Sequence, residues 1–285
     1  MNEQRHPFIG SEALAANELT RHELRRYYRA IMPNVYLDKR ITPTLGQRTS
    51  AAWLWSGREA VVAGLAASAI HGAKWVDDNV PIELIWRNAR APRNVVTRAD
   101  LLLRHESEQL AGVRVTTPER TAFDIGRRGR LGTAVACLDS LAAATRFAVD
   151  DVAAMTIEHR GARGLPQLRR ALRLMDAGAE SPKETWLRLL LIEADYPPPR
   201  TQIPVLSPDG QRRYYLDMGW EDLKLAVEYD GDHHRSDPAQ FAYDIRRLAD
   251  VDDLGWRLVR VAARSRRGDV LGRVQRAWEA RSTLR

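Results

Sequence analysis

The sequence has little of what secreted or membrane-embedded proteins usually contain. Cys137 is the single cysteine, so no disulfide can form within the chain, which fits a reducing cytoplasm. The longest apolar run, residues 60–70, is too short to span a bilayer. The first residues lack the basic and then apolar layout of a secretory signal. We therefore expect a cytoplasmic protein with no membrane association.

What the chain has in excess is positive charge. Its 285 residues include 44 Lys and Arg against 37 Asp and Glu, which gives a formal net charge of +7. The sequence pI is about 9.8. Such a balance favours a polyanionic partner, most simply DNA, with RNA as the alternative nucleic acid. An arginine-rich proteome would produce the same balance without any such partner.

The pattern of apolar residues predicts an α+β chain with three domains. Residues 1–45 read as two short helices followed by a β-hairpin, which is the outline of a winged helix-turn-helix. Residues 46–178 are expected to form a mixed, mostly helical middle domain. Residues 179–285 are expected to form an α/β domain with the element order αβββαβα, after a linker at residues 176–180.

The second helix of the first domain is a candidate for DNA contact. Thr20 and Glu23 form the pattern of a capping box at its start, and the helix is expected to run to about Tyr28. A turn at residues 32–34 and a strand at residues 35–37 follow. Its basic residues suit phosphate and major-groove contacts; they are Arg21, Arg25 and Arg26, with His22 and Arg29 beside them. A solvated basic helix face would contain the same residues.

The middle domain shows helices and strands but no catalytic group of residues. Helices are expected at residues 48–56, 59–72, 117–126, 131–144, 149–158 and 164–175, and strands at residues 82–86, 95–96 and 113–115. Glu119, Arg120 and Asp124 are better explained by helix capping and local ion pairs than by catalysis. The glycine-containing residues 161–164 lack the lysine and the preceding strand of a phosphate-binding loop.

Residues 212–234 contain the clearest indication of a site. They read as two β-strands joined by a turn at Glu221–Leu223, and strand alternation divides their side chains between two faces. One face carries the acidic residues Asp217, Glu228 and Asp230. The other face is apolar and is expected to lie in the core: Tyr214, Leu216, Met218, Trp220, Leu225, Val227 and Tyr229.

If the turn is centred after Asp222, Asp217 lies directly opposite Glu228. Carboxylates that face each other across a hairpin repel unless a cation lies between them. Clustered carboxylate oxygens are what a hard cation such as Mg²⁺ prefers. The small neighbours Gly219 and Ala226 are expected to leave room on this face for a substrate. A solvated acidic surface is the alternative.

The order of elements around this hairpin resembles that of a known enzyme superfamily. A helix at residues 181–194 and a strand at 201–206 precede the hairpin, and a helix at 237–254, a strand at 256–262 and a helix at 269–281 follow it. The step between the last two strands is expected to be a right-handed parallel crossover. With Asp217 and Glu228 on strands two and three, this domain resembles the restriction-endonuclease-like PD-(D/E)XK nucleases. Very-short-patch-repair endonucleases are the more similar branch, because a Glu-x-Asp-Gly-x-x-His segment and an Asp-x-x-Arg helix follow in order, at residues 228–234 and 244–247.

That resemblance implies hydrolysis of phosphodiester bonds that depends on Mg²⁺ or Mn²⁺. The implied roles are metal ligand for Asp217, Glu228 and Asp230, contact with the metal or its waters for Glu184, general base or acid for His234, and phosphate binding for Arg246 or Arg247. The alternatives are ordinary surface contacts for His233 and His234, and pairing of the two arginines with Asp244 or Asp250 of their own helix.

One position departs from the nuclease pattern. The superfamily usually has a lysine two residues after the strand-three carboxylate, where this chain has Asp230. Another cationic side chain that the sequence places nearby would replace that lysine: His234, Lys224 or Lys183. Otherwise the nuclease-like fold would serve binding alone.

Two stretches of the first half resemble a different family. FIGSEALAANELTRHELRRYYRAIMPNVYLDK at residues 8–39 and TTPERTAFDIGRR at residues 116–128 resemble actinobacterial proteins of the abortive-infection (type IV) antitoxin-like family. Those proteins open with a winged helix-turn-helix, which implies DNA binding, control of transcription and a toxin partner. We expect a DNA-binding protein with a metal-dependent endonuclease-like C-terminal domain. The alternative is a non-catalytic transcriptional regulator or antitoxin-like protein with a degenerate nuclease fold.

Overall fold

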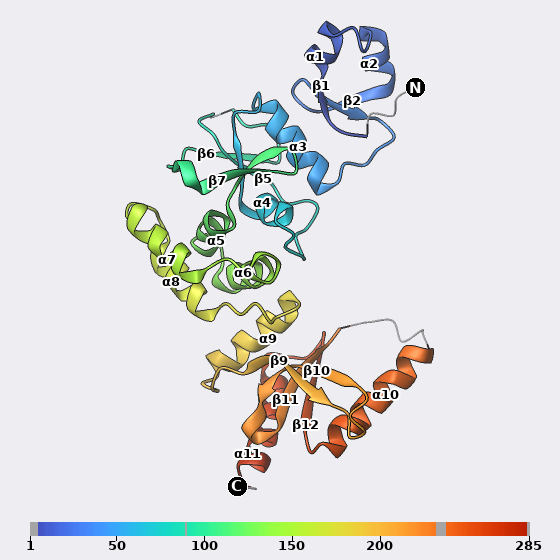
Figure 1. Cartoon of the computed structure of the whole chain (residues 1–285), viewed down its shortest axis with the longest axis vertical. Helices are drawn as coiled ribbons and strands as arrows, with labels where there is room; N and C mark the ends of the chain where they lie inside the picture. The colour runs from blue at the N-terminus through green and yellow to red at the C-terminus, as the bar shows by residue number, and fades with distance from the viewer. Residues whose placement is uncertain (1–4, 89, 232–237, 284–285) are drawn as a thin grey trace. The chain divides into compact units, whose positions relative to one another are not determined.

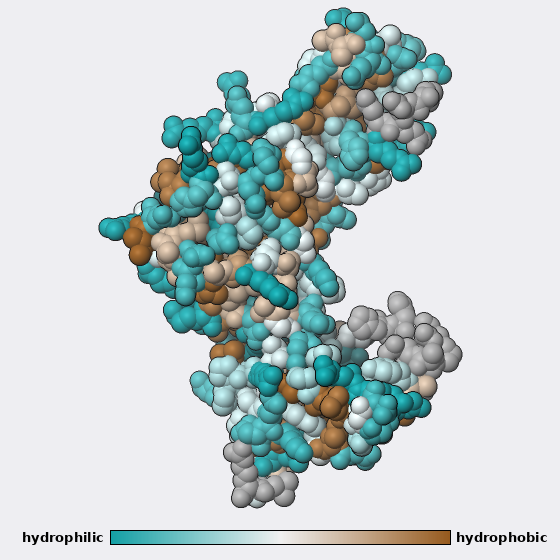
Figure 2. Space-filling model, in the orientation of Figure 1, coloured by the Kyte–Doolittle hydropathy of each residue, from teal (hydrophilic) through white to brown (hydrophobic). Residues whose placement is uncertain are grey.

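The protein is described by a computed structural model that covers residues 5–88, 90–231 and 238–283. The chain divides into two compact units, Met1–Met175 and Asp176–Arg285 (Figure 1). Hydrophilic residues cover most of the face shown in Figure 2, where hydrophobic residues form small separate patches. In the described part of the chain, no helix combines the length and the apolar character that a membrane crossing requires.

The first unit opens with a small three-stranded sheet and two helices. Its elements are β1 (Phe8–Ile9), α1 (Gly10–Ala15), α2 (Arg21–Tyr27), β2 (Tyr28–Met32) and β3 (Val35–Asp38), and the strands are antiparallel in the order β1-β3-β2. The Thr20 hydroxyl accepts a hydrogen bond from the Glu23 N–H at 3.2 Å, and the Glu23 carboxylate accepts one from the Thr20 N–H at 2.8 Å. This confirms the predicted capping box, which sets the residue where α2 begins.

A five-stranded sheet follows in the order β6-β5-β4-β8-β7. Its elements are α3 (Leu45–Trp55), β4 (Val61–Ala63), α4 (Gly64–Ile70), β5 (Ile82–Ile85), β6 (Val95–Arg98), β7 (Ser107–Leu110) and β8 (Val113–Thr116). The single helix expected over residues 59–72 is wrong, because β4 is the central strand and all three of its residues are buried. A short apolar run that is covered on both faces has no alternation, so its pattern does not separate a strand from a helix.

Four helices complete the first unit, at nearly the positions expected. They are α5 (Pro118–Gly126), α6 (Leu131–Thr145), α7 (Val149–Glu158) and α8 (Leu165–Leu174). Helix α5 packs against α4, α6, α7 and α8, and its residues from Arg120 to Gly126 are all buried. The Thr117 hydroxyl accepts a hydrogen bond from the Arg120 N–H at 3.3 Å, and Pro118 occupies the first helical position. The start of α5 is therefore set by neighbouring residues.

The second unit has the expected order αβββαβα. Its elements are α9 (Pro182–Glu193), β9 (Arg200–Leu206), β10 (Arg213–Trp220), β11 (Leu225–Asp230), α10 (Pro238–Asp253), β12 (Arg257–Ala262) and α11 (Arg267–Ser282). The sheet order is β12-β11-β10-β9. Strands β11 and β12 are parallel, as predicted, and the other pairs are antiparallel.

Both faces of the β10–β11 hairpin are covered, which corrects the expected open acidic face. Met218 and Trp220 pack with α9 and α11, whereas Tyr214 and Leu216 belong to a second cluster with Ala226 and with Val251 of α10. Ala226 is fully buried, and a side chain at Gly219 would collide with the Leu225 carbonyl. The single apolar face expected from alternation is therefore wrong for Tyr214 and Leu216, which pack with Ala226 and not with Met218 and Trp220.

Candidate functional site

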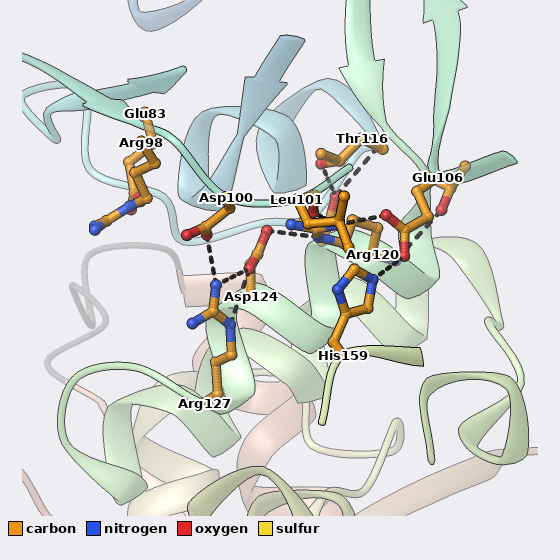
Figure 3. Close-up of polar contacts among 12 residues, drawn as sticks. Glu83, Arg98, Asp100, Leu101, Glu106, Thr116, Arg120, Asp124, Arg127 and His159 are labelled. Atoms are coloured by element: carbon orange, nitrogen blue, oxygen red, sulfur yellow. Dashed lines mark hydrogen bonds and ion pairs between the residues drawn. The ribbon is translucent and has the colours of Figure 1, made fainter. Parts of the chain in front are cut away.

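The first unit contains a buried ion network centred on Arg120 of α5 (Figure 3). The Arg120 Nε donates a hydrogen bond to Asp124 at 3.0 Å, and its Nη1 donates to the Leu101 carbonyl at 2.8 Å and to Glu106. Arg120 is 1% exposed, and the Glu106 and Asp124 side chains are 0% exposed. Charged groups this deep in a protein stay only when each has a partner of opposite charge.

His159 closes the network from the far end of α7. Its Nε2 contacts one oxygen of Glu106, while the other oxygen accepts hydrogen bonds from Arg120 and from the Leu103 N–H at 2.7 Å. The His159 ring lies against Phe123, with ring centroids 5.2 Å apart. Both oxygens of Glu106 are thus occupied by groups from three different segments of the chain.

The network continues toward β5 through a row of alternating charges. Asp124 also accepts hydrogen bonds from Arg127 at 2.8 and 3.1 Å, and Asp100 accepts one from Arg127 at 2.6 Å and pairs with Arg128. Arg128 in turn pairs with Glu83 at 3.2 Å. Burial lowers the pKa of Arg128 despite these acidic neighbours. The row joins the end of α5 to strand β5 of the sheet.

A cavity of about 770 Å³ opens beside this network. Its lining includes the paired arginines of the network, the two acids Asp100 and Glu158, and the loop that carries Arg160 and Arg163, whose side chains are exposed. Among the described residues that line it there is no serine, threonine, cysteine or lysine. The guanidinium groups of the lining therefore suit the binding of an anionic group.

Sequence reasoning missed this network although it noticed two of its members. The local pair of Arg120 and Asp124 exists, as the helical spacing suggested. Glu106 and His159 lie 14 and 39 residues away in the chain, so no local pattern connects them to Arg120. One signal was available in the sequence: Arg120 and Asp124 share a helix face with the apolar Phe123. A surface ion pair would not need an apolar neighbour, so this arrangement indicates a buried pair.

In the second unit, Asp217 and Glu228 face each other as predicted. The register of β10 and β11 pairs Met218 with Val227, and one further step places Asp217 opposite Glu228. An Asp217 oxygen accepts a hydrogen bond from the Tyr229 N–H at 2.8 Å. Burial, followed by the charge of Glu228, raises the pKa of Asp217 to about 7.

The cationic partner of Glu228 is an arginine of α10. Both oxygens of Glu228 accept hydrogen bonds from Arg247, one of them at 3.1 Å, and Arg247 also donates to the Tyr215 carbonyl at 2.9 Å. Arg247 therefore contacts the sheet, and the charge of this guanidinium acts to lower the pKa of Asp217. Arg247 therefore neutralises Glu228, whereas burial and the charge of Glu228 still raise the pKa of Asp217.

The other predicted site residues have different surroundings. Glu184 accepts hydrogen bonds from the Glu180 N–H at 2.9 Å and the Ser181 hydroxyl at 2.8 Å, and burial raises its pKa. Asp230 pairs with Arg260 of β12 at 2.8 Å. Arg246 is exposed on α10. His233 and His234 lie outside the described residues.

These carboxylates do not fit a three-ligand metal site in the arrangement described. Among described residues, ligand atoms of three suitable side chains approach within 4.8 Å only at His105, Glu106 and Glu158, in the first unit. Glu106 there is already bonded to Arg120 and His159. A divalent cation at Asp217 and Glu228 would first have to displace Arg247.

The basic residues of α2 lie on the surface of the first unit. Arg21, Arg25 and Arg26 are exposed, and none of them forms an ion pair within the described part of the chain. The Lys39 ammonium donates to the carbonyls of Arg25 and Arg26 at 2.6 and 3.2 Å and so closes the last turn of α2. The Arg25 Nε donates to the Arg21 carbonyl at 3.3 Å, and the Arg26 guanidinium lies over the Tyr27 ring, so all three arginines stay on the exposed side of one short helix.

Comparisons with known proteins concern the first unit most directly. Residues 50–176 match the family model of the AbiEi antitoxin C-terminal domain, a range that contains every residue of the Arg120 network. Two uncharacterized proteins of Mycobacterium tuberculosis, from strains CDC 1551 / Oshkosh and H37Rv, are each 29% identical over 217 residues, which is 76% of this chain and 79% of theirs. No solved structure matches the chain. The family match supports the antitoxin-like resemblance and gives no support to the nuclease resemblance.

Proposed function

We propose that this protein is a non-catalytic, DNA-binding regulator of the antitoxin type. The observation that carries the proposal is the match of residues 50–176 to an antitoxin domain. A small module with exposed arginines directly precedes that domain in the chain. The reading of the protein as chiefly an endonuclease has less support, because Arg247 already neutralises Glu228.

The order of elements in the N-terminal module supports DNA binding. Two helices are followed by a hairpin, and β1 joins the sheet beside β3, an arrangement typical of winged helix-turn-helix modules. In such modules the second helix enters the major groove. Here that helix would be α2, and Arg21, Arg25 and Arg26 would contact phosphates or base edges. The turn at Pro33 and Asn34 would be the tip of the wing.

The cavity beside the Arg120 network supports a role for the middle domain in binding a toxin partner. Arg160 and Arg163 are exposed at its rim, while the arginines behind them are held by acidic residues of the network. A rigid, arginine-lined hollow favours a partner that inserts an acidic side chain. We expect the toxin surface that docks here to be acidic.

The DNA-binding proposal predicts that Arg25→Ala with Arg26→Ala weakens binding to DNA from upstream of the protein's own gene. Loss of two phosphate contacts is expected to reduce affinity by about 10- to 100-fold at physiological salt. Footprinting and a gel-shift titration with the full chain measure the effect. The matched control is Arg169→Ala with Arg170→Ala, which removes two exposed arginines from α8. Equal losses in both variants, or a wild-type protein without a footprint, would contradict the proposal.

A second candidate function is phosphodiester hydrolysis by the second unit. The favouring observation is the pair of opposed carboxylates Asp217 and Glu228, with the charge of Glu184 close enough to raise the pKa of Asp217 further. This candidate predicts cleavage of plasmid DNA or RNA with Mg²⁺ or Mn²⁺ that Asp217→Ala and Glu228→Ala abolish. It also predicts a melting shift on adding Mg²⁺ that Asp217→Ala removes. Absence of both effects in the wild-type protein would leave the regulator proposal alone.

A further inference from the structure

The positive charge of this chain is concentrated at its C-terminal end. Residues 255–285 contain nine arginines, no lysine and two acidic residues, so their net charge is +7, which equals that of the whole chain. The preceding 254 residues are therefore neutral in sum. A general arginine bias of a proteome would spread its charge along the chain, so this concentration calls for a local cause.

A groove of about 680 Å³ gathers these arginines between β12 and α11. Five arginines line it, and Asp252 is the single acidic residue among its described lining; the arginines are Arg257, Arg260, Arg273, Arg276 and Arg281. Arg257, Arg260 and Arg276 are exposed, and the other two are partly buried. Asp230 neutralises Arg260. The other four arginines keep the groove strongly positive.

Helix geometry explains why the arginines of α11 share one wall. Arg273, Arg276 and Ala280 follow each other at intervals of three and four residues, which places them on one side of a helix. Val270 and Val274 pack on the sheet instead, together with Val259 and Val261 of β12. The small Ala277 and Ala280 leave the floor of the groove open to a bulky ligand.

Hydrogen bonds to backbone carbonyls hold two arginine side chains of α11 in place. Arg273 donates to the Arg260 carbonyl at 2.8 Å, and Arg281 donates to the Gly255 carbonyl. Strand β12 is the last strand in the described sheet order. These two contacts tie α11 to β12 and to the residue just before Trp256.

We propose that this groove binds the phosphodiester backbone of DNA. Guanidinium groups form paired hydrogen bonds with phosphate oxygens, and arginine without lysine is the composition that such recognition favours. An acidic peptide would match the charge, but specific peptide binding also needs pockets for side chains, whereas half of the residues that line this groove are charged. The inference deepens the proposed function, since it places a second DNA contact in the second unit, apart from α2.

The experiment measures binding of the full chain to a labelled DNA duplex of random sequence by fluorescence anisotropy over a series of salt concentrations. Arg257→Ala with Arg276→Ala removes two exposed groove arginines, and Arg200→Ala with Arg213→Ala removes two exposed arginines of the same unit outside the groove. Each lost phosphate contact is expected to reduce the slope of log affinity against log salt by about 0.9. The groove variant should lose about two units of slope, and the control variant should keep the wild-type slope.

A groove variant with the wild-type slope, or equal losses in groove and control variants, would overturn the inference. So would a preference of the groove for a polyglutamate peptide over the duplex. Melting curves of all variants show whether a loss reflects unfolding, and Arg257→Lys with Arg276→Lys, which keeps the charge, gives a folded comparison. The proposed function is judged separately: it fails if changes in α2 leave binding to the upstream DNA unchanged, whatever the groove variants do.

Discussion

Arg120→Met is expected to destabilise the first unit by about 3–5 kcal/mol, because it leaves Glu106 and Asp124 buried without their shared cation. The methionine replaces the aliphatic part of the side chain but none of its hydrogen bonds. Chemical denaturation followed by circular dichroism measures the change as a lower midpoint for the first unit's transition. This is the largest single effect that the structure predicts, because the partners are fully enclosed.

A matched control and a second variant separate charge from packing. Arg130→Met removes an exposed arginine just before α6 and should change the midpoint little. Adding Glu106→Gln to Arg120→Met should recover part of the lost stability, since one of the stranded charges is then gone. If the double variant is as unstable as the sum of the two single variants, the network does not act through its charges.

Asp217→Asn is expected to stabilise the protein at pH 8 by about 2–4 kcal/mol and to change little near pH 4. Burial raises the pKa of Asp217 from 3.8 to about 7, so the folded state holds this proton more tightly than the unfolded state does. The resulting stability is fully present below about pH 4 and is lost as the pH rises to about 7. Asparagine keeps an oxygen for the Tyr229 N–H but never acquires the charge.

Thermal or chemical unfolding of both proteins between pH 4 and pH 8 tests this expectation. The wild-type midpoint should fall toward pH 8, and the Asp217→Asn midpoint should fall less. Asp253→Asn, an exposed residue at the end of α10, is the control. Parallel curves for the wild-type protein and Asp217→Asn would show that this carboxylate stays charged throughout the range, held so by Arg247.

Local sequence signals placed most elements of this protein. The capping box at Thr20 marked the start of α2, and the turn at Glu221–Leu223 set a register that the structure reproduces. Each of these signals depends on a few neighbouring residues, so packing elsewhere in the fold does not shift the start of the helix or the register of the hairpin. Strand β4 was missed because its three apolar residues have no alternation, and only pairing with β5 and β8 makes them a strand.

The sequence predicted the two polar sites to different extents. It brought Asp217 and Glu228 together and led to the expectation of a metal ion between them, whereas the fold supplies Arg247 as the partner of Glu228. It read Arg120 and Asp124 as a local pair and had no means of adding Glu106 or His159. In both cases the missing group comes from another element of the fold.

The sequence by itself determined the order of elements in the second unit, the hairpin register, the surplus of positive charge and the likeness to antitoxin proteins. The tertiary structure alone decided which charges neutralise each other and which stay free for a partner. The physical reason is that capping, alternation and turns act over a few neighbouring residues, whereas the energy of a buried charge depends on every group packed around it. For that reason arginine has three different environments in this protein. Arg247 pairs with Glu228, Arg120 lies in a buried ion network, and the arginines beside β12 line a groove.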